Sequence, residues 1–155
     1  MTQTPTLLDS LLKETADRFG LPFESGSAGL EFEAGPFVAN MLVHPVQPQQ
    51  LLVQVAVMTL GEDTDPRLYR VMHQLNELAR FEHEWIITVD IDGEVFLSRT
   101  VPIQASTAAM LEDLLGDAIG RAEHLQRALS QSVADPQVAA SPSVPAMVVS
   151  AALRV

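Results

Sequence analysis

Residues 65–103 have the sequence DPRLYRVMHQLNELARFEHEWIITVDIDGEVFLSRTVPI, and we expect them to form a helix followed by a two-stranded hairpin. Asp65 suits the N-cap and Pro66 the first helical position, because the N–H that proline lacks has no partner there. Apolar residues then recur at helical spacing as far as Arg80. Apolar and polar residues alternate around Asp92-Gly93, a dipeptide typical of a two-residue type I′ turn. Nothing in this stretch indicates catalytic chemistry.

Sequence signals on both sides of this stretch predict the other elements. A first helix begins after Thr6, which forms a capping-box pattern with Asp9, and it ends at Gly20. Three strands follow, and their connections are too short for a crossover helix, so they form an antiparallel meander. The last helix begins at a Ser106 cap, ends near Gln131 and carries an apolar stripe. The expected strands of the meander are Leu30–Glu33, Phe37–His44 and Leu51–Leu60.

The chain is therefore expected to be an α+β protein with the order α-β-β-β-α-β-β-α, in which helices pack on an antiparallel sheet. We expect residues 1–131 to form a single domain, and residues 132–155 to form a partly flexible C-terminal extension rich in Pro, Ser, Ala and Val. The stripes of the first and last helices suit one face of the sheet. The other face is also apolar, so the middle helix, a second copy of the chain or a ligand peptide has to cover it.

The extension has two parts of different composition. Pro136, Pro142 and Pro145 lie among Ser, Ala and Val, which indicates a linker. Residues 146–153 are apolar and uncharged, so they are expected to fold back as a strand or a short helix, or to dock on another chain. One hypothesis is that the extension is a self-inhibiting plug of this chain's own partner-binding site, in which case truncation at Gln131 increases partner binding.

The composition excludes several classes of function. The 155 residues include no Cys, which excludes disulfides and thiolate sites and suits a reducing cytoplasm. Twenty acidic residues against nine basic ones give a net charge of −11, which repels phosphates, so no direct nucleic-acid binding is expected. No apolar run approaches the roughly 20 residues of a membrane span, and the first residues lack the pattern of a signal peptide. We expect a cytoplasmic protein that does not bind membranes.

Three motifs superficially suggest a site, and each has a simpler explanation. The acids of Asp90-Ile91-Asp92-Gly93-Glu94 lack the spacing of a calcium loop and suit a hairpin turn. Glu82-His83-Glu84, even with His73, lacks the spacing that places two imidazoles on one helical face. A nucleophile elbow requires a strand directly before its serine, and no strand is predicted before Ser27. We therefore expect no enzyme activity, no catalytic residue, no cofactor and no metal.

Three further motifs accompany the element order: Phe19-Gly20-Leu21-Pro22, Leu75-Asn76-Glu77-Leu78 and Val101-Pro102-Ile103 after the hairpin. Over residues 5 to about 130 the chain resembles the superfamily of class I type III secretion chaperones and the related YbjN-like proteins. The resemblance implies a secretion-chaperone-like fold and an acidic homodimer that holds an extended or partly unfolded segment of another protein. The Leu-Asn-Glu-Leu and Asp-Gly-Glu-Val features favour the YbjN-like branch, with a regulatory or stress-response role. The alternative is a dedicated type III secretion effector chaperone.

Two sets of residues are candidates for the contacts with a second copy of the chain and with a partner segment. One set contributes to self-association or, alternatively, fills the core of the monomer: Leu68, Tyr69, Met72, Leu75 and Trp85. The other set forms a surface that accepts a partner segment by strand addition or apolar packing: Val38, Leu42, Leu52, Ala56 and Met58. A hypothesis of another class is a small-molecule-sensing domain, which predicts a large apolar cavity near Trp85.

Overall fold

The structure is a computed structural model, and it describes residues 6–80 and 85–134. It contains the helices α1 (Leu7–Phe19), α2 (Pro66–Ala79) and α3 (Ala108–Ala134), the strands β1 (Gly29–Ala34), β2 (Phe37–Val43), β3 (Gln50–Thr59), β4 (Ile86–Val89) and β5 (Glu94–Pro102), and a short 3-10 helix at Ile103–Ala105. The expected α+β class and the order of its elements are confirmed. The first residues of the predicted extension, 132–134, belong to α3, so the helix runs past the predicted end near Gln131, and residues 135–155 lie outside the described residues.

The five strands form one antiparallel sheet with the spatial order β1-β2-β3-β5-β4. The first three strands make the expected meander. The chain then passes through α2 and returns at β4, which forms an edge of the sheet, before β5 pairs between β4 and β3. The two edges of the sheet are therefore β1 and β4.

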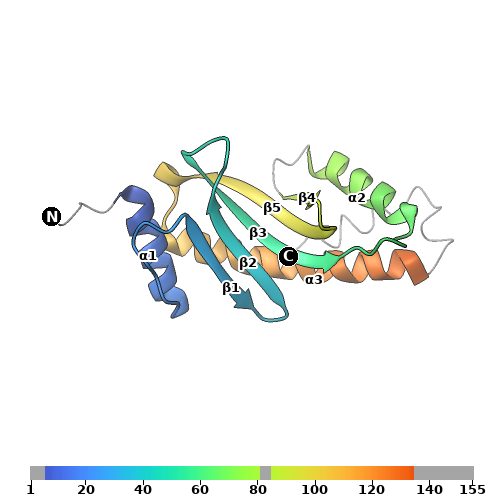
Figure 1. Ribbon diagram of the computed structural model, residues 1–155, viewed down its shortest axis with the longest axis horizontal. Helices are drawn as coiled ribbons and strands as arrows, with labels where there is room; N and C mark the ends of the chain where they lie inside the picture. The colour runs from blue at the N-terminus through green and yellow to red at the C-terminus, as the bar shows by residue number, and fades with distance from the viewer. Residues whose placement is uncertain (1–5, 81–84, 135–155) are drawn as a thin grey trace.

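The described helices leave one face of the sheet uncovered. In Figure 1, α3 runs behind the sheet along its length, with α1 at one end and α2 at the other. The contacts agree with this view: α3 packs on β3, α1 packs on α3 and β1, and α2 packs on α3 and β4. Of the three coverings expected for the second face, the middle helix is thus excluded by its position beside β4.

The hydrophobic core lies between α3 and the inner strands of the sheet. Alternate residues of β3 point toward α3 and are buried, while the residues between them are half-buried on the opposite face. This alternation is the period of two that a strand imposes on its side chains. The buried side chains that face one another across this layer include Leu51, Val53, Val55, Leu97, Leu111, Leu115 and Leu129.

The ends of α1 follow the signals that predicted them. The hydroxyl of Thr6 accepts a hydrogen bond from the Asp9 N–H at 3.1 Å, and the Asp9 carboxylate accepts one in return from the Thr6 N–H. At the other end, Gly20 has a positive φ of 66°, which glycine adopts without steric cost. The capping box and the glycine stop are both confirmed.

The hairpin between β4 and β5 differs from the prediction of a two-residue turn. Val89 pairs with Val95, and the Asp90 N–H donates to the Glu94 carbonyl at 3.0 Å. Three residues, 91–93, therefore form the loop, and a three-residue loop typically ends in a residue with positive φ, here Gly93 at 80°. The Asp90 carboxylate stabilises the loop by accepting hydrogen bonds from the N–H groups of Asp92 and Glu94, both at 2.9 Å.

The predicted cap of the last helix was wrong by one residue. The hydroxyl of Thr107 accepts a hydrogen bond from the Met110 N–H at 3.2 Å, so Thr107 is the N-cap of α3. The Ser106 hydroxyl instead donates to the Pro102 carbonyl at 2.8 Å. Both residue types suit an N-cap, and the short 3-10 helix before them decides which one occupies that position.

We predict that Gly93→Ala destabilises the fold more than Gly35→Ala. Both glycines have positive φ, which costs other residues about 1–2 kcal/mol. An added Cβ at Gly93 also lies 2.7 Å from the Leu60 carbonyl oxygen, whereas one at Gly35 meets nothing within 4 Å. Urea unfolding measures both free energies, and equal losses in the two variants would contradict the steric argument.

Candidate functional site

The uncovered side of the sheet, called the open face here, consists of three rows of side chains that cross the strands. The pairing register places one residue from each of the five strands in the first two rows, and one residue from every strand except β4 in the third. The first row is Glu33, Val38, Ala56, Phe96 and Thr88; the second is Glu31, Asn40, Gln54, Ser98 and Ile86; and the third is Gly29, Leu42, Leu52 and Thr100. Apolar side chains dominate the first and third rows, and polar ones dominate the second.

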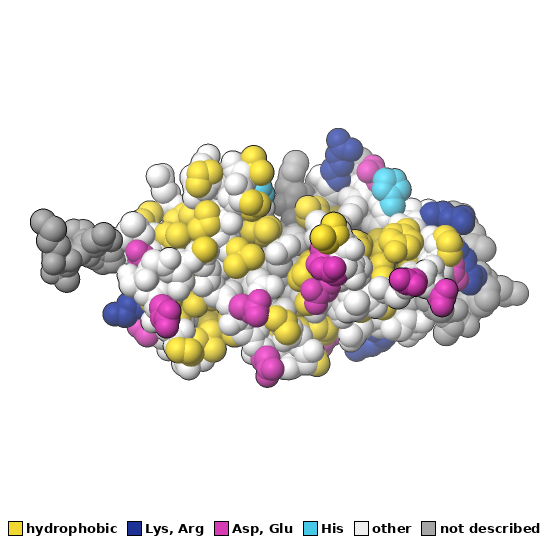
Figure 2. All heavy atoms as spheres, viewed as in Figure 1, with side chains coloured by type: hydrophobic (Ala, Val, Ile, Leu, Met, Phe, Trp, Pro, Cys, Tyr) yellow, Lys and Arg dark blue, Asp and Glu magenta, His cyan; other side chains and the backbone are white. Residues whose placement is uncertain are grey.

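Several hydrophobic side chains of the open face are accessible to solvent. The exposed fractions are 40% for Val38, 36% for Leu42 and 46% for Ile86. Figure 2 views this face and shows hydrophobic side chains gathered over the strands. Glu31 and Glu33 are exposed on β1 at the border of the same face. The open face is therefore an apolar surface with acidic residues along one edge.

A hollow on the open face lies over β3, β4 and β5. Its floor is polar, because the Gln54 Nε2 donates to the Ser98 hydroxyl at 3.1 Å and the hydroxyls of Thr88 and Ser98 lie 3.1 Å apart. The hollow is lined by His44, Leu52, Gln54, Ile86, Thr88, Ser98, Arg99 and Thr100. Such a surface offers apolar contact around a few groups that form hydrogen bonds, which suits a peptide side chain.

Four of the five residues predicted for partner binding lie together on the open face. Val38 pairs with Ala56, and Leu42 pairs with Leu52, so these side chains form two adjoining apolar pairs. Met58 does not join them. A β-bulge shifts the register between Ala56 and Met58, and Met58 instead lines a second hollow with residues of α3, including Gln126. The bulge could not be predicted from the alternation of residues along β3. It is visible only in the irregular pairing of β3 with β5.

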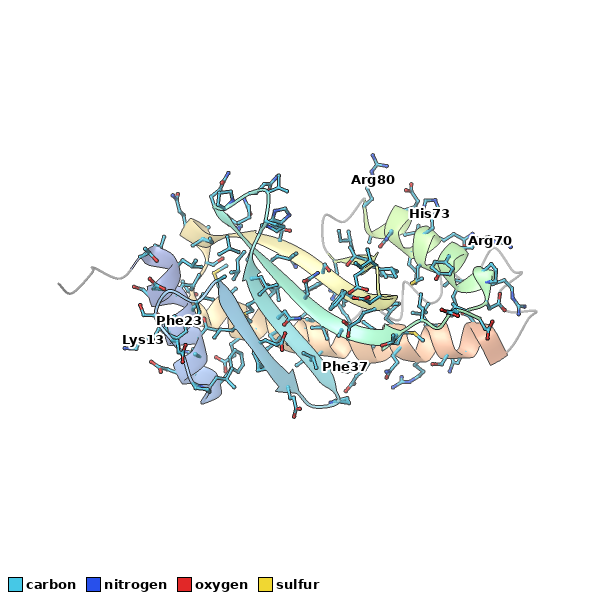
Figure 3. All side chains as sticks on the ribbon, in the orientation of Figure 1. Lys13, Phe23, Phe37, Arg70, His73 and Arg80 are labelled. Atoms are coloured by element: carbon cyan, nitrogen blue, oxygen red, sulfur yellow. The ribbon has the colours of Figure 1, made fainter. Side chains whose placement is uncertain are left out.

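Four of the five residues predicted for self-association lie in the core of the chain itself. Leu68, Met72, Leu75 and Trp85 have exposed fractions of 6% or less and belong to the core cluster. Tyr69 differs, because 48% of it is exposed. Figure 3 shows Arg70, His73 and Arg80 extending from α2 away from the sheet, and Tyr69 therefore lies on a helix whose outer side is accessible.

Trp85 fills a position that was expected to border a ligand cavity. Its indole N–H donates to the Asp117 carboxylate of α3 at 3.0 Å, and the Arg99 guanidinium lies 6.0 Å from the centre of its ring. Asp117 also binds Arg121 at 2.8 Å. Trp85 lines neither of the two hollows described above. The small-molecule hypothesis therefore receives no support at this residue, where protein groups surround the ring.

The free edge of β4 is closed by a side chain of α2. Ile87 points its backbone N–H and carbonyl away from β5, and both bind the Asn76 side chain: the N–H donates to Oδ1 and Nδ2 donates to the carbonyl, each at 2.7 Å. Unpaired edge groups are a template for adding another strand. Asn76, within the Leu-Asn-Glu-Leu motif, thus blocks strand addition in the middle of this edge.

Ser27, which superficially suggested a nucleophile, and His44, which lines the hollow on the open face, both have structural partners. The Ser27 hydroxyl donates to the Glu24 carbonyl at 2.6 Å. His44 Nδ1 accepts hydrogen bonds from the N–H groups of Val46 and Gln47, at 3.2 and 3.1 Å, and so orders the loop before β3. Among the described residues no group of three His, Cys, Asp or Glu side chains is placed to hold a metal ion. Glu82-His83-Glu84 lies outside the described residues.

Two carboxylates have lowered pKa values, and both act as helix caps. The pKa of Asp9 lies below its ordinary value because the carboxylate accepts hydrogen bonds from the Gly26 N–H and from Thr6. The pKa of Asp65 is lowered by hydrogen bonds from the Arg67 side chain and backbone N–H. Both shifts are explained by structural hydrogen bonds, and neither indicates a catalytic acid.

The sequence of this chain matches the model of a known protein family. Residues 10–126, from α1 into α3, match the model of the Tir chaperone protein (CesT) family. The chain belongs to this family. The match supports the secretion-chaperone side of the resemblance, and the family's role as chaperones supports a non-enzymatic function. Neither the YbjN-like branch nor a stress-response role, which the sequence motifs favoured, receives support from it.

Solved structures show the same fold. The ExsC-ExsE complex has a TM-score of 0.64 at 24% identity, with 83% of this chain and 97% of that chain covered. The HopA1-SchA chaperone-effector complex has a TM-score of 0.64 at 8% identity, covering 82% and 98%. The Yersinia pestis type III secretion chaperone SycH, in complex with a fragment of YscM2, has a TM-score of 0.56 at 20% identity, covering 77% and 99%. A search of curated proteins finds no match.

Within residues 6–80 and 85–134, every helix is too short or too polar to cross a bilayer.

We predict that Asn76→Ala destabilises this CesT family member, by about 1–3 kcal/mol, because it removes both partners of the Ile87 backbone. Gln74→Ala is the matched control, since Gln74 is exposed on the same helix. Urea unfolding gives both free energies. Equal stability of the two variants would show that water replaces the Asn76 side chain without loss.

Proposed function

We propose that this chain is a type III secretion effector chaperone, which holds a segment of an effector protein on the open face of its sheet. The observation that carries the proposal is an apolar sheet face that no described helix covers, in a member of a chaperone family. Burying such a face against another chain is favourable, at roughly 25 cal/mol per Å² of apolar surface. The role needs no catalytic group and takes place in the bacterial cytoplasm.

The rows of the open face define the chemistry of the segment. Successive rows lie two residues apart along each strand, or roughly 7 Å, which is also the distance between side chains i and i+2 of an extended peptide. A segment lying along the strands therefore presents apolar side chains to the first and third rows. Between them it meets Asn40, whose Oδ1 is buried and accepts no hydrogen bond from the described residues. A donor at the middle position of the segment would satisfy that oxygen.

We predict that Leu42→Asp reduces affinity for the effector segment at least about tenfold, because the new carboxylate must be desolvated against an apolar partner. Leu42 is 36% exposed, so the variant is expected to fold. The measurement is affinity capture from the native bacterium, with recovered proteins identified and quantified by mass spectrometry. The unfolding midpoint of each variant is measured in parallel.

Val46→Asp is the control for this experiment. Val46 is 80% exposed and lies in the loop between β2 and β3, outside the three rows, so the same charge is added away from the open face. Secreted effectors in the wild-type eluate support the proposal. Recovery of only housekeeping or stress proteins contradicts the secretion role, and unchanged recovery with folded Leu42→Asp contradicts the surface.

We also propose that the chain acts as a homodimer through the outer side of α2. Tyr69 supports this proposal, because it is a large, half-exposed aromatic side chain on a helix whose opposite side is buried against α3 and β4. Aromatic side chains of this kind often dominate the energy of a protein interface. The four buried candidates, Leu68, Met72, Leu75 and Trp85, then act indirectly by fixing the position of α2.

We predict that Tyr69→Glu converts the dimer into a monomer, while Gln74→Glu leaves it intact. Each change adds one negative charge to α2, but only the first removes an aromatic contact. Light scattering at micromolar concentration measures the mass. A wild-type protein that is strictly monomeric would exclude the dimer, and a dimeric Tyr69→Glu variant would exclude this side of α2.

A further inference from the structure

The second row of the open face carries hydrogen-bond acceptors on three adjacent strands. Glu31 pairs with Asn40, and Asn40 pairs with Gln54, so the three side chains lie next to one another on β1, β2 and β3. Residues directly opposite each other in an antiparallel pair have Cβ atoms about 5 Å apart. A single group of a bound segment can therefore reach two of these side chains at once.

The oxygen atoms of these three side chains receive no donor from residues 6–80 and 85–134. Asn40 Oδ1 is buried without a hydrogen bond. The Gln54 side chain uses its nitrogen, which donates to the Ser98 hydroxyl at 3.1 Å, and its Oε1 remains available to accept. The Glu31 carboxylate is exposed and forms no ion pair with a described Lys or Arg. The row thus offers three acceptors to a partner.

The charge around this row is negative. Glu33 is exposed on the same strand as Glu31, two residues or roughly 7 Å along β1. The basic side chain that lines the hollow of this face, Arg99, does not pair with either glutamate; its guanidinium lies 6.0 Å from the centre of the Trp85 ring. The potential over the row therefore attracts a positive group.

A donor that carries positive charge and no acceptor suits such a row. Arg and Lys are the side chains of this kind, with five and three N–H donors. Their hydrogen bonds to a carboxylate are charge-assisted and stronger than those between neutral groups. Their apolar stems can lie along Val38 and Leu42, which flank Asn40 on β2.

Other side chains fit the second row less well. An apolar side chain would remove water from the oxygens of Asn40 and Gln54 without replacing their hydrogen bonds. An acidic side chain would add an acceptor opposite acceptors and would be repelled by Glu31. A neutral amide supplies donors, but it also brings a carbonyl oxygen that the row does not need.

We propose that the segment held on the open face carries an arginine or a lysine over the second row, with apolar residues two positions before and two positions after it. Glu31, Asn40 and Gln54 then determine which segment binds, while Val38 and Leu42 supply apolar contact on either side. The inference rests on the proposed function, because it requires a segment that lies along the strands of this face. It adds the chemical class of the central residue.

Selection from a phage-displayed library of short random peptides tests the inference without a known effector. Full-length wild type and Leu42→Asp are used as targets in parallel, and peptides that bind only the wild type are assigned to the open face. Among these we expect the pattern apolar-x-Arg/Lys-x-apolar to be enriched at least about tenfold over its frequency in the peptides selected by Leu42→Asp.

Glu31→Lys is expected to change the central preference from Arg or Lys to Asp or Glu. Glu31 is exposed, so the variant is expected to fold, and its unfolding midpoint checks this. Glu31→Gln, which only removes the charge, is expected to weaken the preference for Arg and Lys without reversing it. Glu24→Lys is the matched control, because Glu24 is exposed in the loop before β1, away from the three rows, and its selected peptides are expected to match those of the wild type.

The outcomes separate this inference from the proposed function. Open-face peptides with an apolar or acidic central residue would overturn the inference and leave the proposed use of the face intact. An unchanged preference for Arg or Lys in folded Glu31→Lys would also overturn it, because the carboxylate would then not select the residue. Identical peptides from wild type and Leu42→Asp would contradict the open face itself, and with it the proposed function.

Discussion

The packing of α3 against β3 is the interaction on which the rest of the structure depends. The helix-facing side chains Leu51, Val53 and Val55 are fully buried, and α3 supplies Leu111, Leu115 and Leu129 to the same layer. Burial of each such side chain contributes about 1.5–3 kcal/mol. Both shorter helices pack on α3 as well, so α3 fixes the position of α1 at one end and of α2 at the other. Because all three α-helices of residues 6–80 and 85–134 pack on the same side of the sheet, none of them covers the open face.

Local signals predicted the elements well, because each signal acts within a few residues. Thr6 and Asp9 lie three residues apart, and the capping box forms whatever the rest of the chain does. Predictions failed where distant contacts decide the outcome. The Asp92-Gly93 dipeptide suits a two-residue turn, but the register of β4 with β5 leaves three residues in the loop. Ser106 and Thr107 are both good caps, and only the 3-10 helix before them makes Thr107 the N-cap.

In the candidate site, too, local signals predicted some positions and distant contacts decided the others. Alternation along β2 and β3 placed Val38, Leu42, Leu52 and Ala56 on one face, since a strand fixes the side of each residue. Met58 left that face because of a bulge opposite Val95, which no local signal marks. The apolar stripe of α2 could not show whether it faces a second copy or α3, since both bury the same residue types. The contact of Asn76 with Ile87 spans eleven residues and depends on how α2 docks, so its motif alone did not reveal it.

An accessible apolar sheet face creates a risk of self-association, and the charge of the chain limits that risk. A net charge of −11 makes two copies repel each other, and Glu31 and Glu33 place part of that charge at the border of the open face. Asn76 closes the middle of one sheet edge by hydrogen bonding rather than by charge. Charge repulsion thus acts at the open face, whereas the hydrogen bonds of Asn76 act at the edge strand β4. Repulsion opposes the packing of another folded acidic copy on the open face, but it does not oppose a neutral or basic extended segment, because such a segment brings no negative charge to β1. An extended segment without acidic residues therefore meets less repulsion at this surface than a second folded copy does.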